Sequence, residues 1–166
     1  MVIKKHIDQN LKHLDRAYEK EADTKKATFY SKLAILELCG WIEISMDGLI
    51  LAHCSKKVKL QDNIKLVESN VRRTYGFDYD QHFKKMLIQL VGVAACERIE
   101  SKIDVAAKTK LAAQLTSLKN IRDRLAHTYI EGMPQANAID APSVTRARLA
   151  EIYVGLKAFQ KALGAL

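Results

Sequence analysis

The chain contains few residues that break helices. It has two prolines among 166 residues, and both, Pro134 and Pro142, lie in the last quarter of the sequence. Because proline removes a backbone donor and clashes with the preceding helical turn, its absence before Pro134 leaves room for long uninterrupted helices. No stretch alternates apolar and polar residues convincingly enough for a strand. The sequence therefore predicts an all-α fold.

A long apolar run is also lacking. A membrane-spanning helix needs about 20 consecutive apolar residues, and Glu37, Glu43 and Asp47 interrupt the most hydrophobic segment. Residues 1–23 are charged throughout and contain no apolar core of the signal-peptide kind. We therefore expect no membrane association, no export, and a cytoplasmic location.

Residues that bind metals are sparse and badly spaced. The three cysteines, Cys39, Cys54 and Cys96, are an odd number and sit among apolar neighbours, which is typical of buried thiols in a reducing compartment. Four histidines lack a paired ligand at metal spacing, and we expect surface or capping roles for them: His6, His13, His53 and His82. The sequence predicts no metal and no other cofactor.

The composition is that of a folded protein with a basic surface. Apolar residues make up 48% of the chain, which is enough for a core in a single domain of residues 1–166. The formal net charge of +8 favours an anionic partner such as RNA or a nucleotide. The positive residues are spread along the chain, however, and most pairs of them suit ordinary solvated surface.

Apolar periodicity predicts five or six helices. We place them at residues 8–21, 28–54, 60–73, 79–97, 104–130 and 143–163. The second is apolar around most of its circumference and should be central, whereas the first should pack peripherally. Because the connections are short, successive helices should lie side by side. The expected architecture is an antiparallel four-helix bundle with one or two additional helices.

Particular residues mark the ends and close contacts of these helices. Asp78 and Asp104 precede two of them as N-caps, and Gly76 can supply a left-handed cap after the third. Gly40 and Gly48 lower helix propensity within the second helix. We expect this cost to be offset by close approach of a neighbouring helix or of a second subunit.

The most informative segment is Arg122-Asp123-Arg124-Leu125-Ala126-His127-Thr128-Tyr129. On a helix, Arg122 and Tyr129 share a face, whereas Arg122 and His127 are about 140° apart around the axis. One chain therefore does not bring the arginine and histidine tightly together. Two copies related by a two-fold axis, however, would line one cleft with two arginines and two histidines.

This segment resembles the ribonuclease motif of the HEPN superfamily, in which four residues separate the arginine from the histidine and a tyrosine follows. It is similar in particular to HepT-like toxins, which pair with nucleotidyltransferase antitoxins. The segment Leu38-Cys39-Gly40-Trp41-Ile42-Glu43 also resembles stand-alone HEPN proteins. The resemblance implies a homodimeric, metal-independent endoribonuclease of a toxin–antitoxin or defence system, whose products carry a 2′,3′-cyclic phosphate.

Arg122 and His127 are the catalytic candidates that the resemblance carries over. Neutral imidazole takes the proton of a ribose 2′-hydroxyl at physiological pH, and guanidinium stabilises charge on the phosphate oxygens. Asp123 lies four residues before His127, where it can fix the imidazole tautomer or merely form a surface pair. Which proton step His127 performs stays open.

Tyr129 has two interpretations, and the chain as a whole has three. In HepT-like proteins the matching tyrosine is modified with adenylate by the antitoxin, which makes Tyr129 a candidate regulatory site; alternatively it packs at the edge of the core. A non-catalytic module that binds RNA, a nucleotide or a nucleotidyltransferase partner is the second functional hypothesis. A helical scaffold in which Arg122 only forms salt bridges is the third.

Overall fold

The computed structural model describes residues 1–126 and 139–166, and every regular element in these residues is helical. The prediction of an all-α fold is confirmed. The elements in chain order are α1 (Lys5–Lys20), α2 (Thr24–Lys57), α3 (Gln61–Arg72), the π-helix η1 (Tyr79–Phe83), α4 (Lys84–Val91), α5 (Val93–Ser101), α6 (Val105–Ala126) and α7 (Pro142–Gly164). None of the helices in these two ranges combines the length and the apolar character that crossing a membrane demands.

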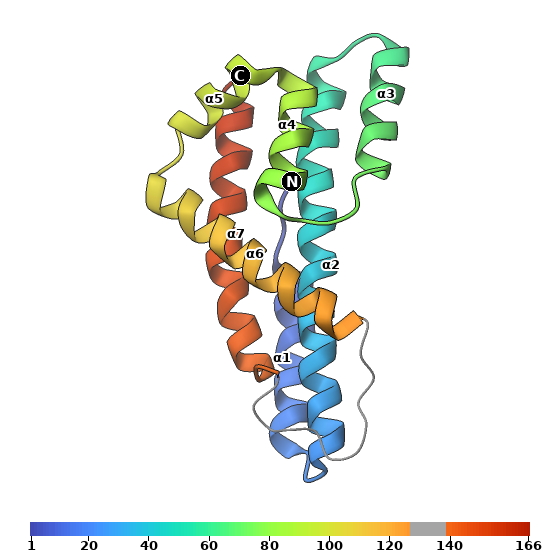
Figure 1. The fold of residues 1–166 in the computed structure, drawn as a ribbon, viewed down its shortest axis with the longest axis vertical. Coiled ribbons are helices and arrows are strands. Elements are labelled where there is room, and N and C mark those ends of the chain that lie inside the picture. The colour runs from blue at the N-terminus through green and yellow to red at the C-terminus, as the bar shows by residue number, and fades with distance from the viewer. Residues whose placement is uncertain (127–138) are drawn as a thin grey trace.

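The long helix α2 is central, as its apolar character predicts. It contacts α1, α3, α4, α6 and α7 and runs the height of the molecule (Figure 1). α7 runs beside it in the same direction, whereas α1 runs in the opposite direction (Figure 1). The N-terminus of α2 is fixed by Asp23, whose carboxylate accepts hydrogen bonds from the backbone amides of Lys25 and Lys26 at 2.8 and 3.3 Å.

The expectation that the first helix packs peripherally is wrong. α1 lies against both α2 and α7, and Leu11 is completely buried between them. Arg146 of α7 also donates a 2.9 Å hydrogen bond to Asp8 of α1. Burial of Ile7 and Leu11 makes α1 part of the main body because even a narrow apolar stripe suffices when two neighbours cover it.

The predicted helix over residues 79–97 is interrupted. Asp78 caps its start as expected, accepting a 2.9 Å hydrogen bond from the amide of Gln81. The chain then breaks at Gly92, whose φ of 80° lies in a region that L side chains rarely adopt. α4 and α5 are therefore separate helices. Asp104 caps α6, as predicted, through a 2.8 Å hydrogen bond from the amide of Ala107.

The glycines do not behave as the sequence predicts. Gly76 has a φ of 123°, but α3 is already capped at Arg73, so Gly76 belongs to the following loop. A Cβ added at Gly40 or Gly48 would meet nothing within 4 Å. No helix among the described residues therefore approaches closely at either position, while contact with a second subunit remains a prediction.

The close approach lies at Gly155 of α7, where α6 crosses. α6 runs obliquely over α7 and α2 (Figure 1). A Cβ at Gly155 would lie 2.7 Å from the Cβ of Leu111 of α6, and Leu111 is completely buried. This contact fixes how α6 leans on α7 and therefore where the last turn of α6 meets α2.

Replacing Gly155 by alanine should destabilise the protein by about 1–3 kcal/mol, the usual cost of overpacking a core. Gly48→Ala is the matched control, since it has open space and should gain roughly 0.5–1 kcal/mol from helix propensity. Urea unfolding followed by circular dichroism measures both. Equal stability of the two variants would show that α6 and α7 are not in contact here.

Candidate functional site

Arg122 lies in the last described turn of α6, where that helix crosses α2. Its Nη1 is 3.0 Å from Oε1 of Glu43 on α2. Its Nε donates a 3.1 Å hydrogen bond to Oδ1 of Asp123, and Nη2 is 3.0 Å from the same oxygen. The guanidinium is thus held in one orientation by two carboxylates from two helices.

A third segment completes the setting of Arg122. The guanidinium carbon lies 5.2 Å from the ring centroid of Phe77, in the loop that precedes η1, which is within the range of a cation–π contact. Phe77 is completely buried. The Arg122 side chain nevertheless stays 28% exposed, so solvent or a ligand reaches it.

The guanidinium keeps donors for an anion. Of its five N–H groups, at most three face Glu43 and Asp123, so Nη1 and Nη2 each retain one N–H. A planar fork of this kind suits phosphate oxygens. The chemical capacity of the site is therefore to hold a phosphate while two carboxylates keep the arginine oriented.

Asp123 belongs to a small charge network. Its Oδ2 is 3.4 Å from Nζ of Lys119, one turn earlier on α6. Burial raises the pKa of Asp123, but the hydrogen bonds and charges of Arg122 and Lys119 outweigh this and hold it below its usual range. Asp123 is thus an anion at neutral pH, the form that the predicted contact with an imidazole needs.

Two of the four predicted site residues fall outside the described ranges. His127 directly follows the last described residue of α6, and Tyr129 comes two residues later. The predicted continuation of α6 to residue 130 and most of the predicted loop at residues 132–142 also lie outside. Arg122 and Asp123 are brought together, whereas the positions of His127 and Tyr129 stay predictions.

Glu43 and Phe77 were not predicted as partners of Arg122. Glu43 lies within the segment at residues 38–43 that resembles stand-alone HEPN proteins, so the two segments that carry the resemblance touch through the Arg122–Glu43 pair. That coincidence was the available signal for Glu43. Phe77 is 45 residues from Arg122 in the chain, and nothing in the local pattern marks it.

Beside this site, α2 presents an apolar strip that nothing in the described residues covers. We call it the α2 face and define it as Phe29, Leu33, Gly40, Ile44 and Asp47. Phe29, Leu33 and Ile44 are 47%, 45% and 74% exposed, and Gly40 has open space above it. The five positions fall within about 60° of the helix circumference, next to Glu43.

Asp47 is the one ionisable member of the α2 face. Burial, and to a lesser extent the charge of Glu43, raises its pKa from 3.8 to about 6. Because the folded protein then binds the proton more tightly than the unfolded chain, stability falls as pH rises from about 3.8 to about 6. Above that window the charged carboxylate opposes folding.

Asp47→Asn should therefore stabilise the protein at pH 7.5 and leave it unchanged below pH 4. After discounting for partial exposure, the expected gain is about 1 kcal/mol. Asp62→Asn is the control, because that carboxylate is 98% exposed and should show no such pH dependence. Urea unfolding at both pH values measures the effect, and an equal change for Asp47→Asn at both would contradict it.

A second polar cluster lies in a groove of about 840 Å³ between η1, α4, α5 and α6. Glu100 accepts a 2.6 Å hydrogen bond from the Tyr79 hydroxyl and pairs with Lys84 at 3.1 Å and Lys108 at 3.7 Å. Burial raises the pKa of Glu100, but these partners outweigh it and keep the carboxyl ionised. Because both lysines form ion pairs with Glu100, the cluster holds the four elements together, and we assign it a structural role.

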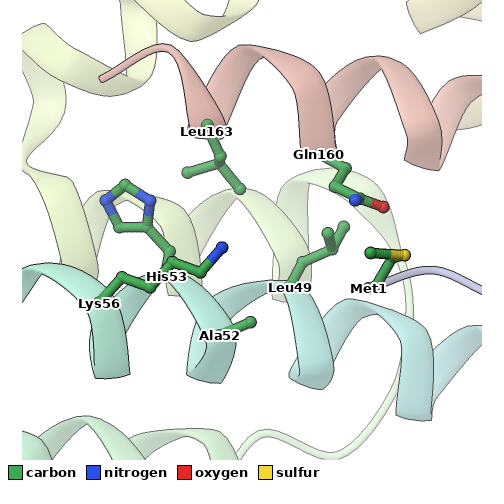
Figure 2. Close-up of a pocket in the computed structure, with 8 residues that line it drawn as sticks. Met1, Leu49, Ala52, His53, Lys56, Gln160 and Leu163 are labelled. Atoms are coloured by element: carbon green, nitrogen blue, oxygen red, sulfur yellow. The ribbon is translucent and has the colours of Figure 1, made fainter.

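A small cavity of about 110 Å³ lies where the ends of α2 and α7 meet Met1 (Figure 2). His53 lines this cavity with Leu163 in the last turn of α7, and burial and then the charge of Lys57 hold its pKa below the usual value. His82 serves the backbone, since its Nδ1 accepts a 3.1 Å hydrogen bond from the amide of Asp78.

The three cysteines are buried and unpaired, as predicted. Burial raises the pKa of Cys39 to about 12, although the nearby charge of Arg122 opposes the shift, so this thiol is not a nucleophile at neutral pH. Within residues 1–126 and 139–166, no three His, Cys, Asp or Glu side chains converge as metal ligands would.

Comparison of the chain with protein-family models, with curated proteins and with solved structures found no match. The geometry around Arg122 and the motif that contains it are therefore the features that indicate a function.

Proposed function

We propose that the protein is a metal-independent endoribonuclease of the HEPN type that acts as a homodimer in a toxin–antitoxin or defence system. One observation carries the proposal: Arg122 is oriented by Glu43 and Asp123 yet keeps exposed donors, at the edge of the uncovered α2 face. His127 follows five residues later, as the motif requires.

The second copy docks on the α2 face. A strip of exposed phenylalanine, leucine and isoleucine with an open glycine at its centre favours helix-to-helix contact. In a two-fold dimer the same face meets itself, and Glu43, which pairs with Arg122, borders that face. Dimerisation therefore brings the Arg122 of each copy toward the two-fold axis, where both His127 side chains complete the cleft.

The reaction is a transesterification within the RNA. The ribose 2′-oxygen loses its proton to an imidazole and attacks phosphorus, and the P–O5′ bond breaks. The departing 5′-oxygen takes up a proton, which leaves a 2′,3′-cyclic phosphate and a 5′-hydroxyl. Two His127 side chains, one from each copy, are enough for the two proton transfers, and Arg122 stabilises charge on the phosphate oxygens.

Tyr129 is the proposed regulatory position. Resemblance to HepT-like toxins implies that a nucleotidyltransferase antitoxin transfers adenylate to this hydroxyl. Tyr129 comes seven residues after Arg122, so the predicted helix to residue 130 would carry both on one face, and an adenylate there would place a phosphate and a base in the cleft. Modification would then block the entry of RNA.

The second candidate function is a non-catalytic module that binds RNA, a nucleotide or a partner protein. One observation favours it: the guanidinium of Arg122 already forms ion pairs with two carboxylates, those of Glu43 and Asp123. A guanidinium already neutralised by carboxylates is a weaker stabiliser of transition-state charge than a free one. RNA affinity without turnover is the result that would select this alternative.

The direct test is incubation of the protein with tRNA and mRNA in EDTA. We expect cleavage without metal, fragments ending in 2′,3′-cyclic phosphate, and loss of cleavage by a factor of about 10²–10⁴ in His127→Ala, the usual contribution of an acid–base residue. Mass spectrometry of the fragments identifies their ends. Absence of cleavage in both proteins would count decisively against the nuclease.

A further inference from the structure

The loop after α3 presents an exposed aromatic residue, Tyr75, close in sequence to two exposed arginines. We call residues 72–76, which are the last residue of α3 and the four residues that follow it, the Tyr75 loop. Tyr75 is 83% exposed, and it follows two exposed arginines, Arg72 and Arg73, directly in sequence. Neither arginine forms an ion pair within residues 1–126 and 139–166. An exposed ring with unpaired cations beside it suits a ligand that has both a flat face and negative charge.

The backbone on both sides of Tyr75 is fixed. The amide and hydroxyl of Thr74 donate hydrogen bonds of 3.0 and 2.9 Å to the carbonyls of Val71 and Asn70, which lie in the last turn of α3. On the other side, Gly76 lies under the His82 ring, which leaves no room for a Cβ because it would come within 2.8 Å of Cε1. The backbone that carries the exposed ring is therefore held by its neighbours on both sides.

The loop adjoins the motif helix. Phe77, two residues after Tyr75, lies with its ring centroid 5.2 Å from the guanidinium carbon of Arg122. Two residues span at most about 7 Å, so Tyr75 is anchored within one or two nucleotide lengths of the proposed catalytic arginine. Arg72, Arg73 and Lys65 also line a hollow of about 380 Å³ together with one carboxylate, Glu68.

We propose that the Tyr75 loop is a subsite for single-stranded RNA: one base stacks on the Tyr75 ring, and adjoining phosphates bind Arg72 and Arg73. The inference rests on the proposed function in one respect, since it makes this strand the one that Arg122 acts on. Single-stranded RNA fits better than a lipid surface because one exposed ring and two exposed arginines in one short segment offer stacking and charge, whereas membrane insertion needs a broader apolar face.

The test measures binding separately from cleavage. A short fluorescein-labelled oligouridine is titrated in EDTA against His127→Ala protein, which binds RNA without cleaving it. The titration is repeated with four double variants, each of which adds one substitution to His127→Ala: Tyr75→Leu, Tyr75→Trp, Arg72→Ala or Arg73→Ala. Loss of one stacked base should weaken binding about 5- to 100-fold in Tyr75→Leu, while Tyr75→Trp retains it. Each arginine variant should lower the slope of log K against log salt by about 0.7.

Arg98→Ala is the matched control, because this exposed arginine lies on α5, away from α3 (Figure 1); it should leave the affinity unchanged. Equal affinities of Tyr75→Leu and Tyr75→Trp would overturn the subsite even if wild-type protein cleaves RNA. Binding that depends on Tyr75, combined with no cleavage of RNA by the wild-type protein, would support the subsite and contradict the proposed nuclease activity. Binding to phosphatidylserine vesicles but not to oligouridine would overturn the assignment to RNA.

Discussion

Arg122→Ala should lower the rate of RNA cleavage about 10²- to 10³-fold, the usual effect of removing one group that stabilises transition-state charge. The guanidinium is oriented by carboxylates from two helices and is still 28% exposed. Alanine removes its positive charge and every N–H that would face the phosphate. Single-turnover cleavage of a labelled RNA measures the change.

Glu43→Gln is the control that separates catalysis from stability. It breaks the same 3.0 Å ion pair but leaves the guanidinium, which Asp123 still holds. Both variants should lose a similar free energy of unfolding, about 1 kcal/mol or less for a pair this exposed, whereas Glu43→Gln should keep its cleavage rate within roughly 10-fold. If Arg122 has only a structural role, the two variants will have the same free energy of unfolding, and neither substitution will change the binding or cleavage of RNA.

Ile44→Glu should dissociate the dimer and abolish cleavage together. Ile44 is 74% exposed in the single chain, so the substitution leaves the fold intact. In the proposed dimer, however, it would bring two carboxylates into an apolar contact, where unpaired charge is strongly disfavoured. We expect a loss of cleavage of more than about 100-fold, because one chain alone cannot supply two histidines to a cleft.

Val105→Glu is the matched control for this substitution, since Val105 is 73% exposed on the first turn of α6. It should remain dimeric and active. Circular dichroism should show the same helix content for both variants. A monomeric Ile44→Glu protein that cleaves RNA at the wild-type rate would exclude the shared cleft. An Ile44→Glu protein that is still dimeric would show that the interface lies away from the α2 face.

Local sequence signals predicted the helices well where the cause is local. Asp78 and Asp104 cap helices as their chemistry dictates, and the apolar character of α2 correctly made it central. The break at Gly92 was missed because apolar spacing continues across it, while the positive φ is set by how α5 must turn toward α7. Likewise, α1 is buried by two neighbours that its own weak periodicity does not reveal.

The site was predicted only in part, for the same reason. Arg122 and Asp123 are neighbours on one helix, so their contact follows from sequence. The contact of Arg122 with Glu43 depends on the oblique crossing of α6 over α2 (Figure 1), and that crossing depends on the fit of Leu111 against Gly155. Such long-range packing has no local signature. The open space at Gly40 could not be predicted either, since it depends on where the other helices pack along α2.

The central claim is that two copies meet on the α2 face and share one cleft. Sedimentation equilibrium of the wild-type protein tests it most directly. The account predicts a mass of twice the 18.7 kDa of one chain, falling to the mass of one chain in Ile44→Glu. A wild-type mass of a single chain at every concentration would contradict the account, because no complete cleft would then exist.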